Sequence, residues 1–312
     1  MIDMIGELNI LATGLKFPEG PVAHGDGSVS IVEIQRGTVS RVTPSGAVDV
    51  VVVAGGGPNG LASGPDGAFY VCNNGGFLFQ NLGGFNHTRP GVHPEYTTGR
   101  IERIDPKTGA IKLLYDRCNG NMLCGPNDIV LDGHGGFYFT DLGKNRSRDR
   151  DHGGVYYARL DGSEIVEIAY PMMTPNGVGL SPDGRTVYVA ETETARLWAF
   201  DLESPGRVRR HPYPSPHGGR LVCGLPGYQR FDSLAVTASG NICVATLVTG
   251  CITVIAPGGD VLRQVMTGDP MTTNICFGGA TMTTAYITLS GTGQLAALEW
   301  PEPGLKLAWS DL

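Results

Sequence analysis

The sequence predicts an all-β protein, and within that class a six-bladed β-propeller with four-stranded antiparallel blades around a central channel. The first supporting observation is composition: of 312 residues, 47 are Gly and 21 are Pro, and only 17% are charged. Gly and Pro together usually make up about 12% of a chain, and charged residues about 25%. Helix formers are therefore scarce, while a hydrophobic share of 41% is too large for a disordered chain.

The second observation is a repeat that runs through the whole chain. Its unit is a Pro-Asn-Gly-like tripeptide, a short apolar strand, an Asp-Gly-like turn and a second apolar strand. We call the Asn, Asp or Glu of the tripeptide the lead residue, and in five copies a turn Gly lies eight residues after it. These pairs are Glu19 with Gly27, Asn59 with Gly67, Asn127 with Gly135, Asn176 with Gly184, and Asp232 with Gly240. A sixth copy, led by Asn274, lacks the turn.

The third observation is the period of the repeat. Successive lead residues are 40, 68, 49, 56 and 42 residues apart. Units of about 40–50 residues with several short strands are typical of propeller blades. Further strands are expected at 100–104, 154–157 and 196–200. Six copies thus predict six blades in a single domain over residues 1–312.

Two features stand outside the regular repeat. The strand-like segments 8–11 and 305–307 flank the repeats, and one of them is expected to complete a blade begun at the other end of the chain, which leaves no open edge. The 68-residue interval requires an insertion at residues 73–99. This insertion joins two strands of the second blade and is predicted to form a lid over one face.

The repeat also predicts a site, because equivalent residues of all blades surround one axis in a propeller. Asn and Asp are common turn formers in their own right, but Glu forms no such turn, and two carboxylates facing one another call for a counter-charge. An all-oxygen ligand set without Cys or His predicts one hard divalent cation, Ca²⁺ first and Mg²⁺ or Mn²⁺ after it. The side chains expected at this channel mouth are Glu19, Asn59, Asn127, Asn176, Asp232 and Asn274.

Several of these segments, taken in order, resemble the senescence marker protein 30 / gluconolactonase / luciferin-regenerating enzyme family. The resemblance implies a six-bladed propeller with one divalent cation, usually Ca²⁺, and hydrolysis of lactones or related esters. It also implies that Glu19, Asn176 and Asp232 bind the metal, with Asn127 as a fourth ligand or a substrate contact. The matching segments are Phe17-Pro18-Glu19-Gly20-Pro21, Pro126-Asn127-Asp128, Thr174-Pro175-Asn176-Gly177, Ser181-Pro182-Asp183-Gly184 and Phe231-Asp232-Ser233.

The chain departs from the family pattern in three places. Phe231-Asp232-Ser233 stands where many members have Pro-Asp-Gly, and the insertion at 73–99 is not a fixed motif of the family. Sugar-lactone members carry an Arg two residues before the equivalent of Asn127, and in this chain that residue is Gly125. A smaller or more apolar lactone is therefore expected.

The predicted mechanism has the cation bind the lactone carbonyl oxygen while water attacks. Asp232 is the first choice as general base, although a ligand so close to a cation has a lowered pKa. His87 of the insertion is the rival, since the ordinary pKa of histidine suits a base near neutral pH. Asn59, Asn74 and Asn274 are expected to line the substrate pocket, with Asn127.

Other classes of function are disfavoured. The net charge is −7, and the basic stretch 144–150 alternates with Asp and is expected to be a solvated loop, so nucleic acid is an improbable partner. No apolar run is long enough to span a membrane, and no signal peptide is recognisable. Seven scattered Cys are typical of reduced thiols. These features predict a cytoplasmic protein. Two alternatives to a lactonase stay open: a non-catalytic propeller that binds a ligand or partner, and a metal-dependent phosphotriesterase. The oxygen-rich ring argues against a third, a metal-free relative resembling strictosidine synthase.

Overall fold

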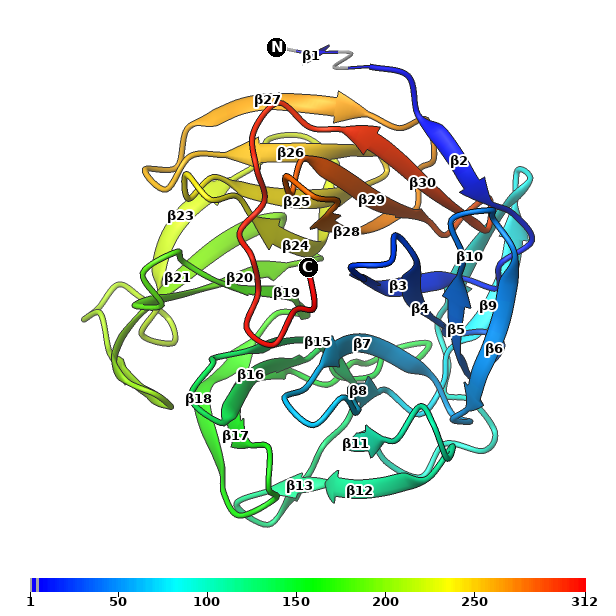
Figure 1. Ribbon diagram of the computed structural model, residues 1–312. Helices are drawn as coiled ribbons and strands as arrows, with labels where there is room; N and C mark the ends of the chain where they lie inside the picture. Colours follow the sequence, from blue (N-terminus) through cyan, green and yellow to red (C-terminus); the bar gives the residue numbers. More distant parts are fainter. Residues whose placement is uncertain (1, 4–5) are drawn as a thin grey trace.

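The computed structural model describes residues 2–3 and 6–312, and in this part of the chain six antiparallel sheets surround a central channel (Figure 1). Each sheet forms one blade, with an innermost strand at the channel and an outermost strand at the rim. The predicted six-bladed β-propeller is therefore confirmed.

Blades 1 to 3 are four-stranded sheets whose strands follow one another from the channel outward. Blade 1 contains β3 (Pro18–Ala23), β4 (Val29–Glu33), β5 (Thr38–Val42) and β6 (Val48–Val53). Blade 2 contains β7 (Pro58–Ser63), β8 (Phe69–Asn73), β11 (Arg100–Ile104) and β12 (Ile111–Tyr115). Blade 3 contains β15 (Pro126–Leu131), β16 (Gly136–Asp141), β17 (Gly153–Arg159) and β18 (Ile165–Met172).

Blade 4 contains β19 (Pro175–Leu180), β20 (Thr186–Glu191) and β21 (Arg196–Ser204), and β21 pairs with both β22 (Arg207–Arg209) and β23 (Arg220–Gly224). Blade 5 contains β24 (Arg230–Val236), β25 (Ile242–Leu247), β26 (Cys251–Ile255) and β27 (Val261–Met266), extended by β1 (Ile2–Asp3). Blade 6 contains β28 (Thr272–Gly278), β29 (Thr284–Leu289), β30 (Gln294–Glu299) and β2 (Asn9–Ala12). Two short hairpins complete the strands, β9 (Leu78–Leu82) with β10 (Phe85–Arg89) and β13 (Arg117–Cys118) with β14 (Asn121–Met122).

The lead residues lie on the innermost strands, near the end at which each strand begins. At this point every innermost strand slips in register against its neighbour, for example between Glu19 and Val22 in β3 and between Pro175 and Val178 in β19. A β-bulge of this kind bends the strand and changes the direction of a side chain. The Pro-Asx-Gly pattern of the repeat therefore marks a bulge next to the channel.

The hydrophobic core is divided into layers between neighbouring blades. Six apolar clusters each join residues of two adjacent blades, as when Tyr138 of blade 3 packs in one cluster with Val187 of blade 4. Strands buried on both faces explain why the repeat reads as short apolar runs rather than as strict alternation.

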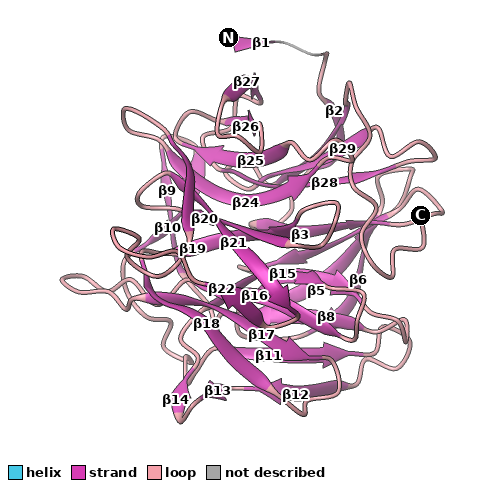
Figure 2. Cartoon of the chain, turned by 90° about the vertical axis from the view of Figure 1, so that its left-hand side faces the viewer, coloured by secondary structure: helices cyan, strands magenta, loops and turns pink. Residues whose placement is uncertain are grey.

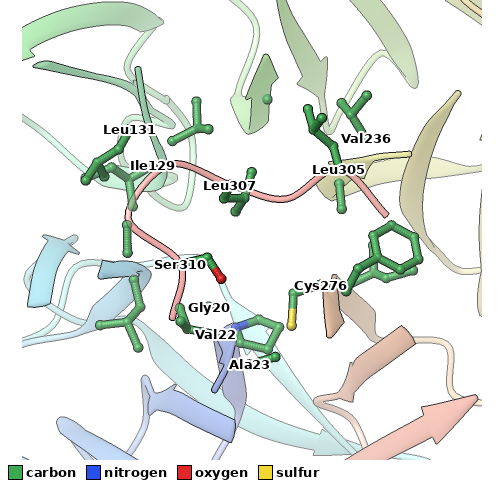
Figure 3. Close-up of a pocket in the computed structure, with 18 of the residues that line it drawn as sticks. Gly20, Val22, Ala23, Ile129, Leu131, Val236, Cys276, Leu305, Leu307 and Ser310 are labelled. Atoms are coloured by element: carbon green, nitrogen blue, oxygen red, sulfur yellow. The ribbon is translucent and has the colours of Figure 1, made fainter. Parts of the chain in front are cut away.

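The ring is closed by the N-terminal segment. β2 pairs antiparallel with β30 and becomes the outermost strand of blade 6, so residues 8–11 are the segment that completes a blade. Residues 305–312 instead lie across the end of the channel opposite the lead residues. There they enclose an apolar cavity of about 100 Å³. Figure 3 shows Leu305 and Leu307 of this segment among side chains of the innermost strands, including Ile129, Val236 and Cys276.

The segment between β8 and β11 leaves blade 2 after Asn73 and returns at Arg100. Its core is the hairpin β9–β10, which lies on the face of the disc opposite the C-terminal end (Figure 2). Across residues 2–3 and 6–312, no helix has the length and apolar character that crossing a membrane would require.

Candidate active site at the channel mouth

A cavity of about 300 Å³ opens at the channel mouth under the hairpin β9–β10. Five of the six lead residues line it: Glu19, Asn59, Asn127, Asn176 and Asp232. All five are at least 92% buried, because the innermost strands that carry them crowd around the axis. The structure thus gathers residues that are up to 213 positions apart in the chain.

The glycine that follows a lead residue is required by this crowding. A Cβ atom on Gly20 would lie 2.6 Å from the backbone oxygen of Asn59, and Gly20 has a φ of +50°. A Cβ on Gly60 would lie 2.5 Å from the backbone oxygen of Asn127. At these positions the backbone of one blade's lead residue presses against the glycine of the blade before it.

Burial raises the pKa of both carboxylates at the mouth. Desolvation raises the pKa of Glu19 to about 7, although hydrogen bonds from Asn274 and Gly20 oppose this shift. Desolvation also raises the pKa of Asp232 well above its usual range, and the negative charge of Glu19 adds to the effect. Two buried carboxylates that disfavour each other's ionisation form a site that a cation would stabilise.

The amides at the mouth differ in how far their hydrogen-bonding capacity is used. Asn176 donates from Nδ2 to Thr192 Oγ1 at 3.1 Å and accepts from Ser233 Oγ at 3.4 Å. The Oδ1 atom of Asn127 is buried and has no hydrogen-bond partner among the described residues. A buried carbonyl oxygen without a donor costs free energy unless a ligand or ion satisfies it.

These observations together fit a hard cation. Carboxylate and amide oxygens are the ligands that Ca²⁺ prefers, and the mouth offers two carboxylates with an unsatisfied amide oxygen beside them. Within the described part of the chain, no three His, Cys, Asp or Glu side chains gather as a metal site. A cation at this mouth would therefore depend on the amides as well as on Glu19 and Asp232.

Two of the residues predicted to line the substrate pocket lie elsewhere. Asn274 lies beside the channel but does not line the mouth cavity in the described structure: its Nδ2 donates to Glu19 Oε2 at 2.7 Å and its Oδ1 accepts from its neighbour's backbone N–H. Asn74 is fully buried at the root of the insertion, where its Oδ1 accepts from Gly76 N at 2.7 Å. Asn274 thus holds the Glu19 carboxylate, whereas Asn74 shapes the turn at the start of the insertion.

A third buried carboxylate, Asp128, is not among the residues that the repeat singles out. It lies next to Asn127, accepts hydrogen bonds from the backbone N–H groups of Ile129 and Val178, and belongs to the channel below the mouth. Desolvation and the charge of Glu19 raise its pKa to about 7. The signal in the sequence is an Asp at a position where three other copies have Gly.

The insertion contributes His87 to the cavity lining. Its Nδ1 lies 2.5 Å from the backbone oxygen of Thr88. A carbonyl oxygen only accepts, so Nδ1 carries the proton and Nε2 holds the free lone pair when the ring is neutral. Asp232 and His87, the two candidate bases, thus line the same cavity from different elements.

The stretch 144–150 was expected to be a solvated loop, and this is wrong at both of its ends. Lys144 is 3% exposed, with Nζ donating to Gly76 O at 3.0 Å between the rings of Phe77 and Tyr96. Arg150 lines the cavity and pairs with Glu193. The loop folds back against the insertion, which sequence periodicity has no means to indicate.

Gly125 is packed too tightly to be replaced by a larger residue. A Cβ atom there would lie 2.7 Å from the backbone oxygen of Gly143, and Leu142 N donates to Gly125 O at 2.9 Å. The space that a longer side chain would need is filled by the backbone of the 142–143 turn.

Residues 17–291 match the family model described as the SMP-30/gluconolactonase/LRE-like region. A gluconolactonase of Zymomonas mobilis is 24% identical over 308 residues. The match covers 89% of this chain and 78% of that protein.

Two solved structures share the fold. A calcium-binding protein, regucalcin, of Agrobacterium tumefaciens superposes with a TM-score of 0.75 at 17% identity, covering 98% of this chain and all of that one. A gluconolactonase of Xanthomonas campestris gives a TM-score of 0.73 at 23% identity, covering 96% and 91%. Since the family model spans most of the sequence, the chain belongs to the SMP-30/gluconolactonase/LRE-like family.

Proposed function

We propose that this protein is a lactonase that opens a cyclic ester at the channel mouth with the help of one divalent cation, Ca²⁺ first. The observation that carries the proposal is the pair of buried carboxylates, Glu19 and Asp232, which line one cavity together with three amides. A propeller that served only as a scaffold has no need of two carboxylates at its axis. The name gluconolactonase of the relative from Zymomonas mobilis supports the same reaction class.

Glu19, Asn127, Asn176 and Asp232 would hold the cation. When bound, it would polarise the lactone carbonyl and stabilise the negative charge that develops on the carbonyl oxygen. In the overall reaction water adds to the carbonyl carbon, the ring C–O bond breaks, the ring oxygen takes up a proton, and the product is a hydroxy acid.

The chain itself supplies the proton acceptor for the attacking water. His87 is suited to this role because Nε2 has its lone pair free while Nδ1 donates to Thr88 O. Asp232 is the alternative, since its raised pKa makes it a better base than an ordinary carboxylate, but binding a cation would lower that pKa again.

The insertion acts as a lid in this proposal. Its hairpin rests on blade 1 through the ring pair Phe79 and Phe17, whose centroids are 5.1 Å apart, and on blade 6 through a bond from Asn86 N to Gly291 O at 2.8 Å. A further bond joins Gly91 N to Asn145 O at 2.9 Å. Contacts with three sides of the mouth hold the hairpin over the cavity, where it limits access of bulk water.

Acid release from γ- and δ-lactones, measured with chelated protein and after adding back Ca²⁺, tests the function. We expect turnover that is lost with the chelator and restored by Ca²⁺. Turnover indifferent to chelation would move the chemistry away from Glu19 and Asp232. No turnover of any lactone despite bound cation would contradict the proposal and favour a phosphotriester substrate or a binding propeller.

A further inference from the structure

The cavity at the channel mouth has two chemically different walls. One wall is apolar: Phe17 and Ile34 flank the strands of blade 1, Leu247 ends β25, Met271 precedes β28, and Phe77 comes from the insertion. These five residues line the cavity and pack into one cluster. The apolar part of a ligand would lie against this wall, as is usual in small-molecule sites.

The other wall is basic and is built from blades 3, 4 and 5. Arg150 Nη2 lies 3.3 Å from Glu193 Oε1, and Arg230 Nη2 lies 2.9 Å from the same oxygen and 2.7 Å from Oε2. Two guanidinium groups therefore share a single carboxylate, and one positive charge has no partner within this group. The Nε atom of Arg230 is buried and makes no hydrogen bond within the described structure.

The charges that line the whole cavity lead to the same conclusion. Four basic side chains, Arg89, Lys144, Arg150 and Arg230, stand against three acidic ones, Glu19, Asp232 and Glu193. Glu19 and Asp232 belong to the proposed cation site, and Asp141 and Asp151 offset the charge of Lys144. Among the lining residues, Glu193 is left to balance Arg89, Arg150 and Arg230. The cavity outside the cation site thus has a surplus of positive charge.

We propose that Arg150 and Arg230 bind a carboxylate of the substrate, so that the preferred lactone carries a carboxylate substituent on an otherwise apolar body. Guanidinium groups present planar forks of N–H donors that match a carboxylate, and such charge-assisted pairs are the stronger hydrogen bonds. The apolar wall receives the rest of the molecule, while the ester carbonyl lies over Glu19 and Asp232. This inference rests on the proposed lactonase function and adds the substrate class to it.

A matched pair of substrates tests the inference: 5-oxotetrahydrofuran-2-carboxylate and its carboxamide, which share the γ-lactone ring and differ in charge. We expect kcat/KM for the carboxylate to exceed that for the carboxamide by about tenfold or more, as a net charge-assisted hydrogen bond predicts. The preference should shrink as salt is raised, because screening weakens partly exposed charges.

Two substitutions must move this preference in opposite directions. Arg230→Gln should lower the carboxylate-to-carboxamide ratio by about 10- to 100-fold. Glu193→Gln should raise this ratio, because the substitution removes the carboxylate that competes with the substrate for the two arginines. The matched control is Arg41→Gln, an exposed arginine paired with Asp26 outside the cavity, which should leave the ratio unchanged. Equal turnover of the two lactones would overturn the carboxylate site while leaving the lactonase in place.

A binding measurement decides the question even if neither lactone is turned over. Tetrahydrofuran-2-carboxylate and its carboxamide have no ester to cleave, and calorimetry can compare their affinities for the wild type and for Arg230→Gln. Tighter binding of the carboxylate to the wild type alone supports the inference. Equal affinities, or a preference that Arg230→Gln retains, overturn it.

Discussion

The Nδ2 atom of Asn274 lies 2.7 Å from Oε2 of Glu19, so blade 6 donates a hydrogen bond to the carboxylate of blade 1 across the point where the propeller closes. Both side chains are at least 95% buried. The bond therefore couples closure of the ring to the position of a carboxylate at the channel mouth.

Asn274→Ala should destabilise the fold by about 1–3 kcal/mol, because it leaves a buried carboxylate short of one donor. The free energy of unfolding in urea measures this. Asn121→Ala, at an exposed position of a short hairpin, should change stability by less than about 0.5 kcal/mol. Equal stabilities for the wild type and Asn274→Ala would mean that the bond does not hold Glu19.

Calcium should raise the melting temperature of the chelated protein. A ligand at a hundred times its dissociation constant adds about 2.7 kcal/mol to stability when it binds only the folded state. Glu19→Gln and Asp232→Asn should each remove most of this gain, which thermal unfolding at increasing Ca²⁺ would reveal. Asp26→Asn, an exposed carboxylate in a surface pair, is the control and should retain the full response. A response that survives in both mouth variants would place the cation elsewhere.

Lys144 should make stability rise with pH above about 8. Burial lowers its pKa from 10.5 to about 8, so between these values the unfolded chain binds a proton that the folded chain does not. Stability then increases with pH, by up to about 3 kcal/mol over the interval.

The test is the difference in unfolding free energy between wild type and Lys144→Met, measured in urea from pH 7 to 10.5. As pH rises, the wild type should become more stable relative to Lys144→Met. Lys112→Met, at an exposed position of β12, should show no such trend. A flat difference for Lys144→Met would show that the ammonium group is not desolvated.

Gly20→Ala should be far more costly than Gly67→Ala. Both glycines have positive φ, +50° and +72°, and a side chain in this region costs about 1–2 kcal/mol. The Cβ of Gly67 would meet nothing within 4 Å, whereas that of Gly20 would lie 2.6 Å from Asn59 O. We expect an additional loss of about 1–3 kcal/mol for Gly20→Ala, measured by urea unfolding, and similar losses for both variants would refute the close packing of lead strands.

His87→Gln should lower kcat by about 10²- to 10⁴-fold if the imidazole is the general base. The calcium-induced rise in melting temperature should stay, because His87 lies on the insertion and not among the proposed ligands. His134→Gln, at an exposed turn, serves as the control. Full activity in His87→Gln would assign the role of base to Asp232.

Local repetition explains why so much of the fold could be predicted. Each Pro-Asx-Gly tripeptide marks the same bulge at the start of an innermost strand, so counting six copies predicted six blades and the ring of Glu19, Asn59, Asn127, Asn176 and Asp232. The insertion was visible because it lengthened one interval of the repeat.

The sequence by itself thus determined the blade number and the oxygen-rich mouth, since these depend on residue type at a regular spacing. Only the tertiary structure decided that Asn274 is bonded to Glu19 and that Arg150 and Arg230 share Glu193. It also decided that residues 9–12 rather than 305–307 close the ring. Such contacts join residues from different blades, and their distances follow from how the blades pack around the axis, which no local pattern of residues encodes.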